Sequence, residues 1–341
     1  MKLLKIFTCS ILFGLPVIAN AQDDIDIYLE AGLDDAKILT ESYISPIMKG
    51  FGYGINNGWY NTAKAHKTLG FDLTFSAQMV FVPKSSEYFK FNNDDYNNIR
   101  LGSGESDQLP TAFGPAEDGP EIDILGEADV NGNREVVGSF NAIGGLGIKD
   151  EIGMNLVPVP MAQLGIGIVK NTDLKIRFIP SIDLGDAKVD LWGFGVMHDV
   201  KQWIPGMKHL PFDLSALVAY TKMSSSYDLQ DVSDTGDGKQ ELLLSASGLT
   251  IQGLISKKFS VLTLYGALGY NKINSSVNVN GSFEVDGYED PMVDPIDLSF
   301  GEGSLRATAG FRLKLAIVTL HADYTINKYP ILSAGLGFSV R

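Results

Sequence analysis

His321 and Asp323 are the two residues whose types and spacing could most readily support catalysis. They lie two positions apart in an alternating segment, so on a β-strand both side chains would face the same side. Such a pair could serve a hydrolase if a strand serine lay opposite. However, the chain contains no Gly-x-Ser-x-Gly elbow, and residues with this spacing also line any polar lumen. We therefore expect no enzymatic activity, with an outer-membrane lipid hydrolase as the weaker alternative.

Other charged residues share the polar faces of alternating segments. In a closed barrel they would face the lumen beside His321 and Asp323. Two interpretations are open: an internal salt-bridge network that fills the barrel, which we favour, and a path for a polar substrate. The lumen-facing candidates of this kind are Lys175, Arg177, Asp183, Arg306, Arg312 and Lys314.

Two acidic segments carry oxygen-bearing residues of the kind that bind metal ions. Asp129 to Glu135 has oxygen-bearing residues at alternate positions, but Gly132 and Arg134 occupy the wrong places for a calcium loop, which favours a hairpin turn. Asp231, Asp234 and Asp237 are typical of a solvated surface loop. We expect neither a metal nor a cofactor.

Aromatic residues interleaved with glycines mark the N-terminal part of the chain. Apolar residues at spacings of one and four predict a short helix over Asp34 to Met48, followed by a flexible glycine-rich stretch. A segment of this kind could fill a wide lumen and contact a ligand, or dock beneath the barrel; we favour the plug. The plug or ligand candidates are Phe51, Tyr53, Trp59 and Tyr60.

Strict alternation of apolar and polar residues indicates the elements that position these side chains. From Leu69 to Phe81 every odd residue is apolar, a pattern that fits a strand and not a helix. The strands predicted in this way fall near residues 69–91, 136–149, 161–170, 173–184, 188–200, 211–226, 240–256, 260–283, 303–315, 316–327 and 331–341, with a weak one at 121–127.

The length and connections of these segments predict a transmembrane antiparallel β-barrel. Runs of about 9 to 13 residues match tilted membrane-spanning strands. Short turns such as 171–172 alternate with long acidic connections such as 93–135, as at the two rims of an outer-membrane barrel. Since bacterial barrels have an even strand number, we expect an all-β fold of 12 to 14 strands over residues 69–341, after an N-terminal segment at 22–68.

The first 21 residues have the pattern of a cleaved signal peptide. Lys2 and Lys5 precede an apolar stretch, and Ala19-Asn20-Ala21 supplies the small residues of a cleavage site. The single cysteine, Cys9, lies within this segment, so we expect no disulfide scaffold. Elsewhere no apolar run is long enough for a membrane helix, and a net charge of −14 argues against a nucleic-acid partner.

Three segments carry a resemblance to a known group of proteins: Ser45 to Gly54, His198 to Gly206 and Ser333 to Phe338. They resemble an uncharacterised family of Gram-negative outer-membrane β-barrels, which is distantly similar to the long-chain fatty acid transporter barrels. The resemblance implies an N-terminal segment before the barrel and a helical excursion that residues 198–210 could supply.

The resulting expectation is an exported protein of the cell outer membrane that binds or passes small hydrophobic or amphipathic molecules. Its expected partners are outer-membrane lipid and a hydrophobic small molecule; the oligomeric state is left open. A structural or surface-interaction barrel is the main alternative.

Overall fold

The computed structural model describes residues 28, 31–183, 187–229, 240–283 and 292–340. The predicted signal peptide and the acidic triplet at 231, 234 and 237 lie outside these residues. Within the described part, no helix is long and apolar enough to cross a membrane.

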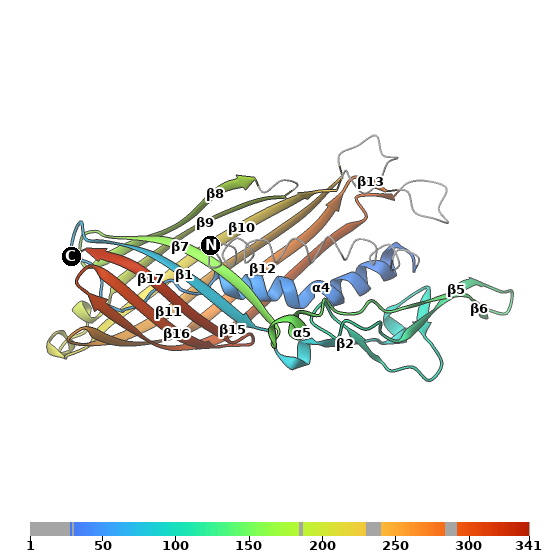
Figure 1. The fold of residues 1–341 in the computed structure, drawn as a ribbon, viewed down its shortest axis with the longest axis horizontal. Coiled ribbons are helices and arrows are strands. Elements are labelled where there is room, and N and C mark those ends of the chain that lie inside the picture. Colours follow the sequence, from blue (N-terminus) through green and yellow to red (C-terminus); the bar gives the residue numbers. More distant parts are fainter. Residues whose placement is uncertain (1–27, 29–30, 184–186, 230–239, 284–291, 341) are drawn as a thin grey trace.

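Ten long antiparallel strands of the described chain close into one barrel (Figure 1). Each strand pairs with its neighbours along the chain, and the ring closes where β1 pairs with β17. The barrel strands are β1 (Phe71–Phe81), β7 (Leu156–Gly167), β8 (Thr172–Asp183), β9 (Ala187–Asp199), β10 (Asp213–Asp228), β11 (Glu241–Phe259), β12 (Leu262–Asn280), β15 (Ile296–Leu315), β16 (Val318–Ile326) and β17 (Ile331–Val340).

The fold class is therefore confirmed, but the expected strand number of 12 to 14 is wrong. The segments predicted at 121–127 and 136–149 form β5 (Glu121–Ala128) and β6 (Arg134–Asn141), which pair outside the barrel with β3 (Ile99–Leu101). Both are eight residues long, shorter than a tilted membrane-spanning strand requires. Alternation alone did not distinguish them from wall strands.

Residues 82–155, here called the extension, connect β1 to β7 and project beyond one end of the barrel (Figure 1). The predicted acidic loop at 93–135 is thus a folded region. The remaining elements of the extension are η1 (Lys84–Ser86), β2 (Tyr88–Lys90), η2 (Asn93–Asp95), β4 (Gln108–Pro110) and α5 (Ile148–Ile152).

The two ends of the barrel differ in their connections. At the short-turn end, β7–β8, β11–β12 and β15–β16 are joined by a few residues each, and β1 begins and β17 ends there. Only the β9–β10 connection is longer at this end, with η3 (Lys201–Trp203) and η4 (Met207–His209) forming the short helical excursion expected from the resemblance. The extension, the β10–β11 and β12–β15 connections, and the hairpin of β13 (Ser282–Phe283) with β14 (Met292–Val293) lie at the opposite, long-loop end.

The wall has an apolar outer face, as alternation predicted, and its inner face is polar toward the short-turn end and aliphatic where it meets α4. On β1, Phe71 and Phe75 are exposed on the outside, whereas Asp72, Thr74 and Gln78 are buried inside. The same division holds on β16, where Leu320 and Tyr324 are exposed on the outside and His321 and Asp323 are buried inside.

Helix α4 (Leu33–Ile55) runs from the long-loop end into the barrel (Figure 1). It is longer than the helix predicted over 34–48, because residues 50–55 continue it instead of forming a flexible stretch. Its glycines serve close packing: a Cβ on Gly50 would lie 2.6 Å from Val157 Cγ2, and one on Gly54 2.4 Å from Val159 Cγ2. The glycines let a helix fit within a ten-stranded wall.

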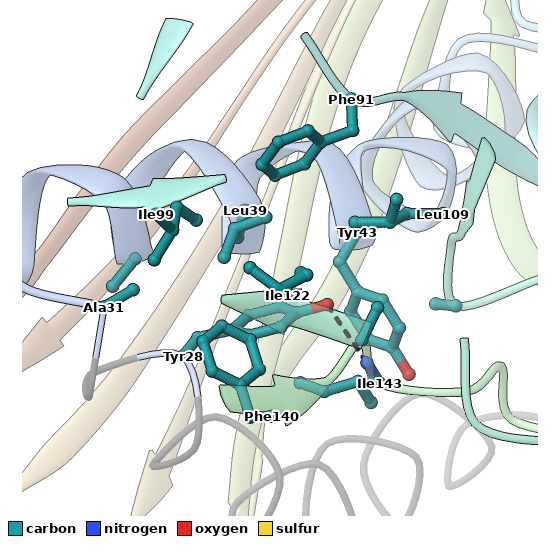
Figure 2. Close-up of a cluster of buried hydrophobic side chains, with 13 residues drawn as sticks. Tyr28, Ala31, Leu39, Tyr43, Phe91, Ile99, Leu109, Ile122, Phe140 and Ile143 are labelled. Carbon is teal, nitrogen blue, oxygen red and sulfur yellow. Dashed lines mark hydrogen bonds between the residues drawn. The ribbon is translucent and has the colours of Figure 1, made fainter. Parts of the chain in front are cut away.

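The first half of α4 packs in the extension (Figure 2). Leu39 and Tyr43 of the helix, together with Tyr28, share a buried cluster with Ile122 and Phe140. The buried Asp35 carboxylate accepts hydrogen bonds from the backbone N–H groups of Asn97 and Asn98, the latter at 2.6 Å. One helix therefore joins the extension to the barrel interior.

Candidate functional site

Residues 33–68, here called the plug, begin in the extension and continue into the lumen. Hydrogen bonds reach them from opposite parts of the wall: Asn57 Nδ2 donates to Ser333 Oγ of β17 at 2.7 Å, whereas Ser215 Oγ of β10 donates to the Ala63 carbonyl at 2.6 Å. Tyr60 Oη donates to Gln252 Oε1 of β11 at 2.8 Å. Because β17 and β10 lie across the ring from one another, the segment between these contacts runs through the interior.

Two wall arginines bind the C-terminal end of α4. Arg177 donates from Nη1 to the Ile55 carbonyl at 2.8 Å and from Nη2 to the Asn57 carbonyl at 2.6 Å, and Arg306 Nη1 donates to the Asn56 carbonyl at 3.2 Å. The last carbonyls of a helix lack intrahelical partners and carry partial negative charge. The two guanidiniums satisfy them. The favoured salt-bridge interpretation is wrong for this pair, whose bonds go to plug carbonyls and polar side chains.

Three of the four predicted plug aromatics anchor the plug to the wall. Trp59 is fully buried beneath Arg177, whose Cζ lies 3.7 Å from the ring centroid, and beside the glycine backbone of β9. Tyr60 meets Tyr265 edge to face with ring centroids 6.0 Å apart. Tyr53 stacks on Tyr329 and donates a hydrogen bond to Glu302 Oε2 at 3.1 Å. Phe51 lines the apolar cavity described below.

His66 binds the wall where the plug reaches the short-turn end of the barrel. It was not identified as a site residue from the sequence. Its Nδ1 lies 2.9 Å from Asp173 Oδ2, its Nε2 lies 3.5 Å from Asp72 Oδ1, and its backbone N–H donates to Asp173 Oδ1 at 2.8 Å. All three side chains are buried. The sequence signal was available, since both aspartates occupy inward positions near strand starts at the short-turn end.

The remaining charged candidates for the lumen differ in where their side chains lie. Lys175 and Arg312 are buried on the inner face, and Lys314, half-buried, donates from Nζ to Ser339 Oγ at 3.0 Å. Asp183 is not in the lumen: the β8–β9 register shifts between Ile179 and Ile182, and Asp183 is exposed at the strand end.

His321 and Asp323 face inward as expected but are not joined. Asp323 Oδ2 accepts a hydrogen bond from Tyr265 Oη at 2.8 Å, and the buried Nδ1 of His321 has no hydrogen-bond partner in the described structure. Among the described residues, the pair therefore lacks the mutual hydrogen bond that a hydrolase would need. The acidic turn at Asp129 is the predicted hairpin: its carboxylate accepts from the N–H groups of Asn131 and Asn133, both at 2.8 Å.

An apolar cavity of about 90 Å³ lies between α4 and one side of the wall. Met48 and Phe51 of the helix form its inner side, and no charged residue lines it. The wall side comes from β7 to β11: Pro158, Val159, Pro160, Ile179, Ile182, Val189, Leu191, Met223, Ser225, Leu244, Ser245 and Ala246.

The wall is unpaired where β7 and β8 border this cavity. These strands pair only from Gln163 opposite Arg177 to Gly167 opposite Asp173, so residues 156–162 of β7 have no partners on β8. On β7 the backbone groups of odd residues face β1, since Gly167 N donates to Gly70 O, and those of even residues face β8, since Ile168 N donates to Thr172 O. Pro158 and Pro160 therefore remove N–H donors on the edge that faces β8.

Pro180 of β8 falls on the facing edge by the same alternation, since Thr172 O is the acceptor on that side. We call this unpaired boundary, between residues 156–162 and 178–183, the seam. The prolines could have indicated the seam from sequence. The cavity could not be predicted, because its lining comes from five strands whose register was unknown.

These features define a class: a closed ten-stranded antiparallel β-barrel with an apolar outer face and an internal plug. The chain belongs to the family described as a family of unknown function, DUF6588, whose model matches residues 1–340. No curated protein is significantly similar to the chain in sequence.

Several solved barrels are similar in architecture. The translocator domain of the autotransporter NalP from Neisseria meningitidis has 11% identity and a TM-score of 0.29, covering 90% of this chain and 98% of that chain. The attachment invasion locus protein Ail of Yersinia pestis has 8% identity and a TM-score of 0.26, with 80% and 99% covered. The toluene transporter TbuX of Ralstonia pickettii has 9% identity and a TM-score of 0.25, with 87% and 97% covered. No residue role is carried over from them.

Proposed function

We propose that this protein is an outer-membrane barrel that binds small hydrophobic or amphipathic molecules between its plug and its wall and passes them across the membrane. The observation that carries the proposal is the apolar cavity directly behind the seam. Ligand would enter from the lipid through the seam, because the plug fills the lumen between the cavity and the short-turn end.

The outer face supports a membrane location. Large apolar side chains are exposed around the wall, including Phe178, Trp192, Leu268, Leu305 and Phe338. A continuous apolar surface of this extent on a closed barrel needs lipid to cover it. The predicted signal peptide is consistent with export through the inner membrane.

The cavity's chemistry limits the ligand. A lining of hydrocarbon, proline and methionine with two serines offers little to a charged group, since burial of an unpaired charge is costly. Met48, Met223 and the unpaired seam can adapt to ligands of different shape. Passage beyond the cavity requires the plug to shift, and the carbonyl contacts of Arg177 and Arg306 hold it in place.

The proposal is tested by mass spectrometry of small molecules extracted from the purified, detergent-folded protein. We expect apolar molecules in the wild-type extract and their loss in Ala246→Phe, which fills the cavity. Ala309→Phe makes the same change on the outer face and should keep them. Equal ligand content in the wild type and in Ala246→Phe, with both proteins folded, would contradict the proposal.

The membrane location is tested by fractionation and gel mobility. Barrels in the outer membrane commonly migrate differently before and after boiling, and we expect this shift for protein recovered from the outer-membrane fraction. Recovery in the soluble periplasm without the shift would exclude the location.

A surface-interaction role is the second candidate, because the extension forms its own buried cluster beyond the barrel rim. The hairpin of β5 and β6 ends in an exposed turn at 129–133. Shortening this turn should reduce attachment of cells to surfaces or to each other if the role is correct, and it should leave ligand content unchanged.

A further inference from the structure

A second cavity, of about 200 Å³, lies at the short-turn end of the lumen. Its lining differs from that of the apolar cavity in its charge. Five cationic side chains and one carboxylate, that of Asp213, contribute to it, together with His66 and three hydroxyl groups. The cationic residues are Lys64, Lys67, Lys258, Arg312 and Lys314, and the hydroxyl residues are Thr62, Thr263 and Ser339.

Arg312 is the central observation. Its side chain lies on the inner face of β15 and is 8% exposed. In the described structure it forms no hydrogen bond or ion pair, and its buried Nε has no partner. A guanidinium has five donors and stays charged, so its burial without a hydrogen-bond partner is costly. Such a group is stabilised when an anion accepts its hydrogen bonds.

The nearby carboxylates do not fill this role. Asp72 Oδ2 accepts a hydrogen bond from Thr74 Oγ1 at 3.0 Å, and Asp72 Oδ1 lies beside His66. Asp173 is held by the same histidine. Across the strand pair, Arg312 lies opposite His321 and Thr263, neither of which carries a negative charge. The cavity therefore has an excess of positive charge around a buried donor.

We propose that this cavity binds a small soluble oxyanion of the phosphate or carboxylate class. Arg312 donates hydrogen bonds to the anion from the base of the cavity, since its planar group suits two oxygens at once. The ammonium groups of Lys258, Lys314 and Lys64 lie around it and contribute charge. The volume admits an ion of a few heavy atoms.

The position of the site favours a soluble anion over a lipid headgroup. Thr263, Arg312, Lys314 and Ser339 lie on the inner faces of their strands, and Lys258 has the inward parity of buried Ser256. The site therefore opens into the mouth of the lumen. A headgroup outside the barrel would meet the apolar outer face instead.

The test titrates inorganic phosphate, and separately acetate, into the detergent-folded full chain and measures binding by isothermal titration calorimetry. We expect saturable binding by the wild type, at least tenfold weaker binding by Arg312→Gln and about threefold weaker binding by Lys258→Ala. Lys257→Ala is the matched control: Lys257 is the neighbouring residue, lies on the outer face beside Phe259 and should bind as the wild type does.

Two results would overturn the proposal. Equal weakening by Lys257→Ala and Lys258→Ala would mean that surface charge alone attracts the anion. Absence of phosphate and acetate binding, with anionic lipid retained by the wild type and lost by Arg312→Gln in native mass spectrometry, would assign the site to a headgroup. If Arg312→Gln does not fold, the comparison of Lys314→Ala with Lys257→Ala decides in its place. None of these measurements depends on the apolar cavity.

Discussion

The two halves of the lumen hold the same plug by different means. Toward the long-loop end, α4 approaches the wall through glycines, meets aliphatic side chains, and borders an apolar cavity at an unpaired seam. From the pair of Gln163 and Arg177 to the short-turn end, β7 and β8 are paired. There, arginines, amides and a histidine bind the plug. The first half can adapt to a guest, whereas the second fixes position through directional bonds.

The largest effect is expected from breaking the polar half. Arg177→Met combined with Arg306→Met removes the donors to the Ile55, Asn56 and Asn57 carbonyls. Hydrogen bonds to charged groups contribute about 1.5–3 kcal/mol each, so the plug should loosen while the wall stays closed. Conductance in planar bilayers should rise several-fold.

Lys175→Met is the control for that experiment, since Lys175 is a buried cation on the same strand as Arg177 and, within the described residues, makes no hydrogen bond to the plug carbonyls. Its conductance should equal that of the wild type. A double arginine variant that keeps its heat-dependent gel shift and its wild-type conductance would show that these contacts do not close the pore.

The next effect concerns packing in the apolar half. In Gly54→Ala the new Cβ would lie 2.4 Å from Val159 and 3.1 Å from Val80. Overpacking costs about 1–3 kcal/mol, which exceeds the roughly 1 kcal/mol that alanine gains in helix propensity. Urea unfolding followed by tryptophan fluorescence should show a lower midpoint. Gly138→Ala, whose new Cβ would have its nearest neighbour at 3.6 Å, should not change it.

The seam should respond to restored donors. Pro158→Val with Pro160→Val returns two N–H groups to the edge of β7 that faces β8, and pairing along residues 178–183 should extend. Hydrogen exchange there should slow, and ligand content should fall severalfold as entry narrows. Pro205→Val, an exposed proline of the short-turn end, should alter neither measurement. Unchanged exchange in the β7 variant would leave the prolines without a role in the seam.

The smallest effect is expected in the extension, at the turn between β5 and β6, outside both halves of the lumen. Hydrogen bonds from the Asn133 and Asn131 backbone hold the pKa of the Asp129 carboxyl below its ordinary value. The stabilisation of the turn by the ionised carboxylate is fully present above the unfolded-state pKa of about 4. It is lost as the pH falls through the lowered pKa of the folded turn. Asp129→Asn should remove the acid-dependent change in the nuclear magnetic resonance signals of the turn. Conductance and ligand content should not change.

Most wall strands could be predicted from sequence, because period-2 alternation is imposed by lipid outside and polar groups inside. The errors have physical causes. Residues 121–127 and 136–149 alternate because they form a sheet in the extension, and Gly50 to Gly54 suggest flexibility unless a wall at contact distance is known. β7 begins at Leu156, whereas the predicted strand starts at 161, and Pro158 and Pro160 lie in the part that was missed.

The site was predictable only in part. The inward parity placed Arg177 and Arg306 in the lumen, but their partners are carbonyls, which no side-chain pattern reveals. Trp59, Tyr60 and Tyr53 belong to the segment that the sequence suggests as a plug, and their contacts with Arg177, Tyr265 and Tyr329 depend on strand register. Asp183 was misplaced because one register shift reverses the faces beyond it.

The pairing of β1 with β17 imposes an order of assembly. β1 ends at Phe81 and β17 begins only at Ile331, and the plug immediately precedes β1. A ring that had already closed would give no side entrance to a helix whose other half is packed in the extension. The plug must therefore lie against the growing sheet before β17 is added, so that β17 closes the ring around a segment that precedes β1.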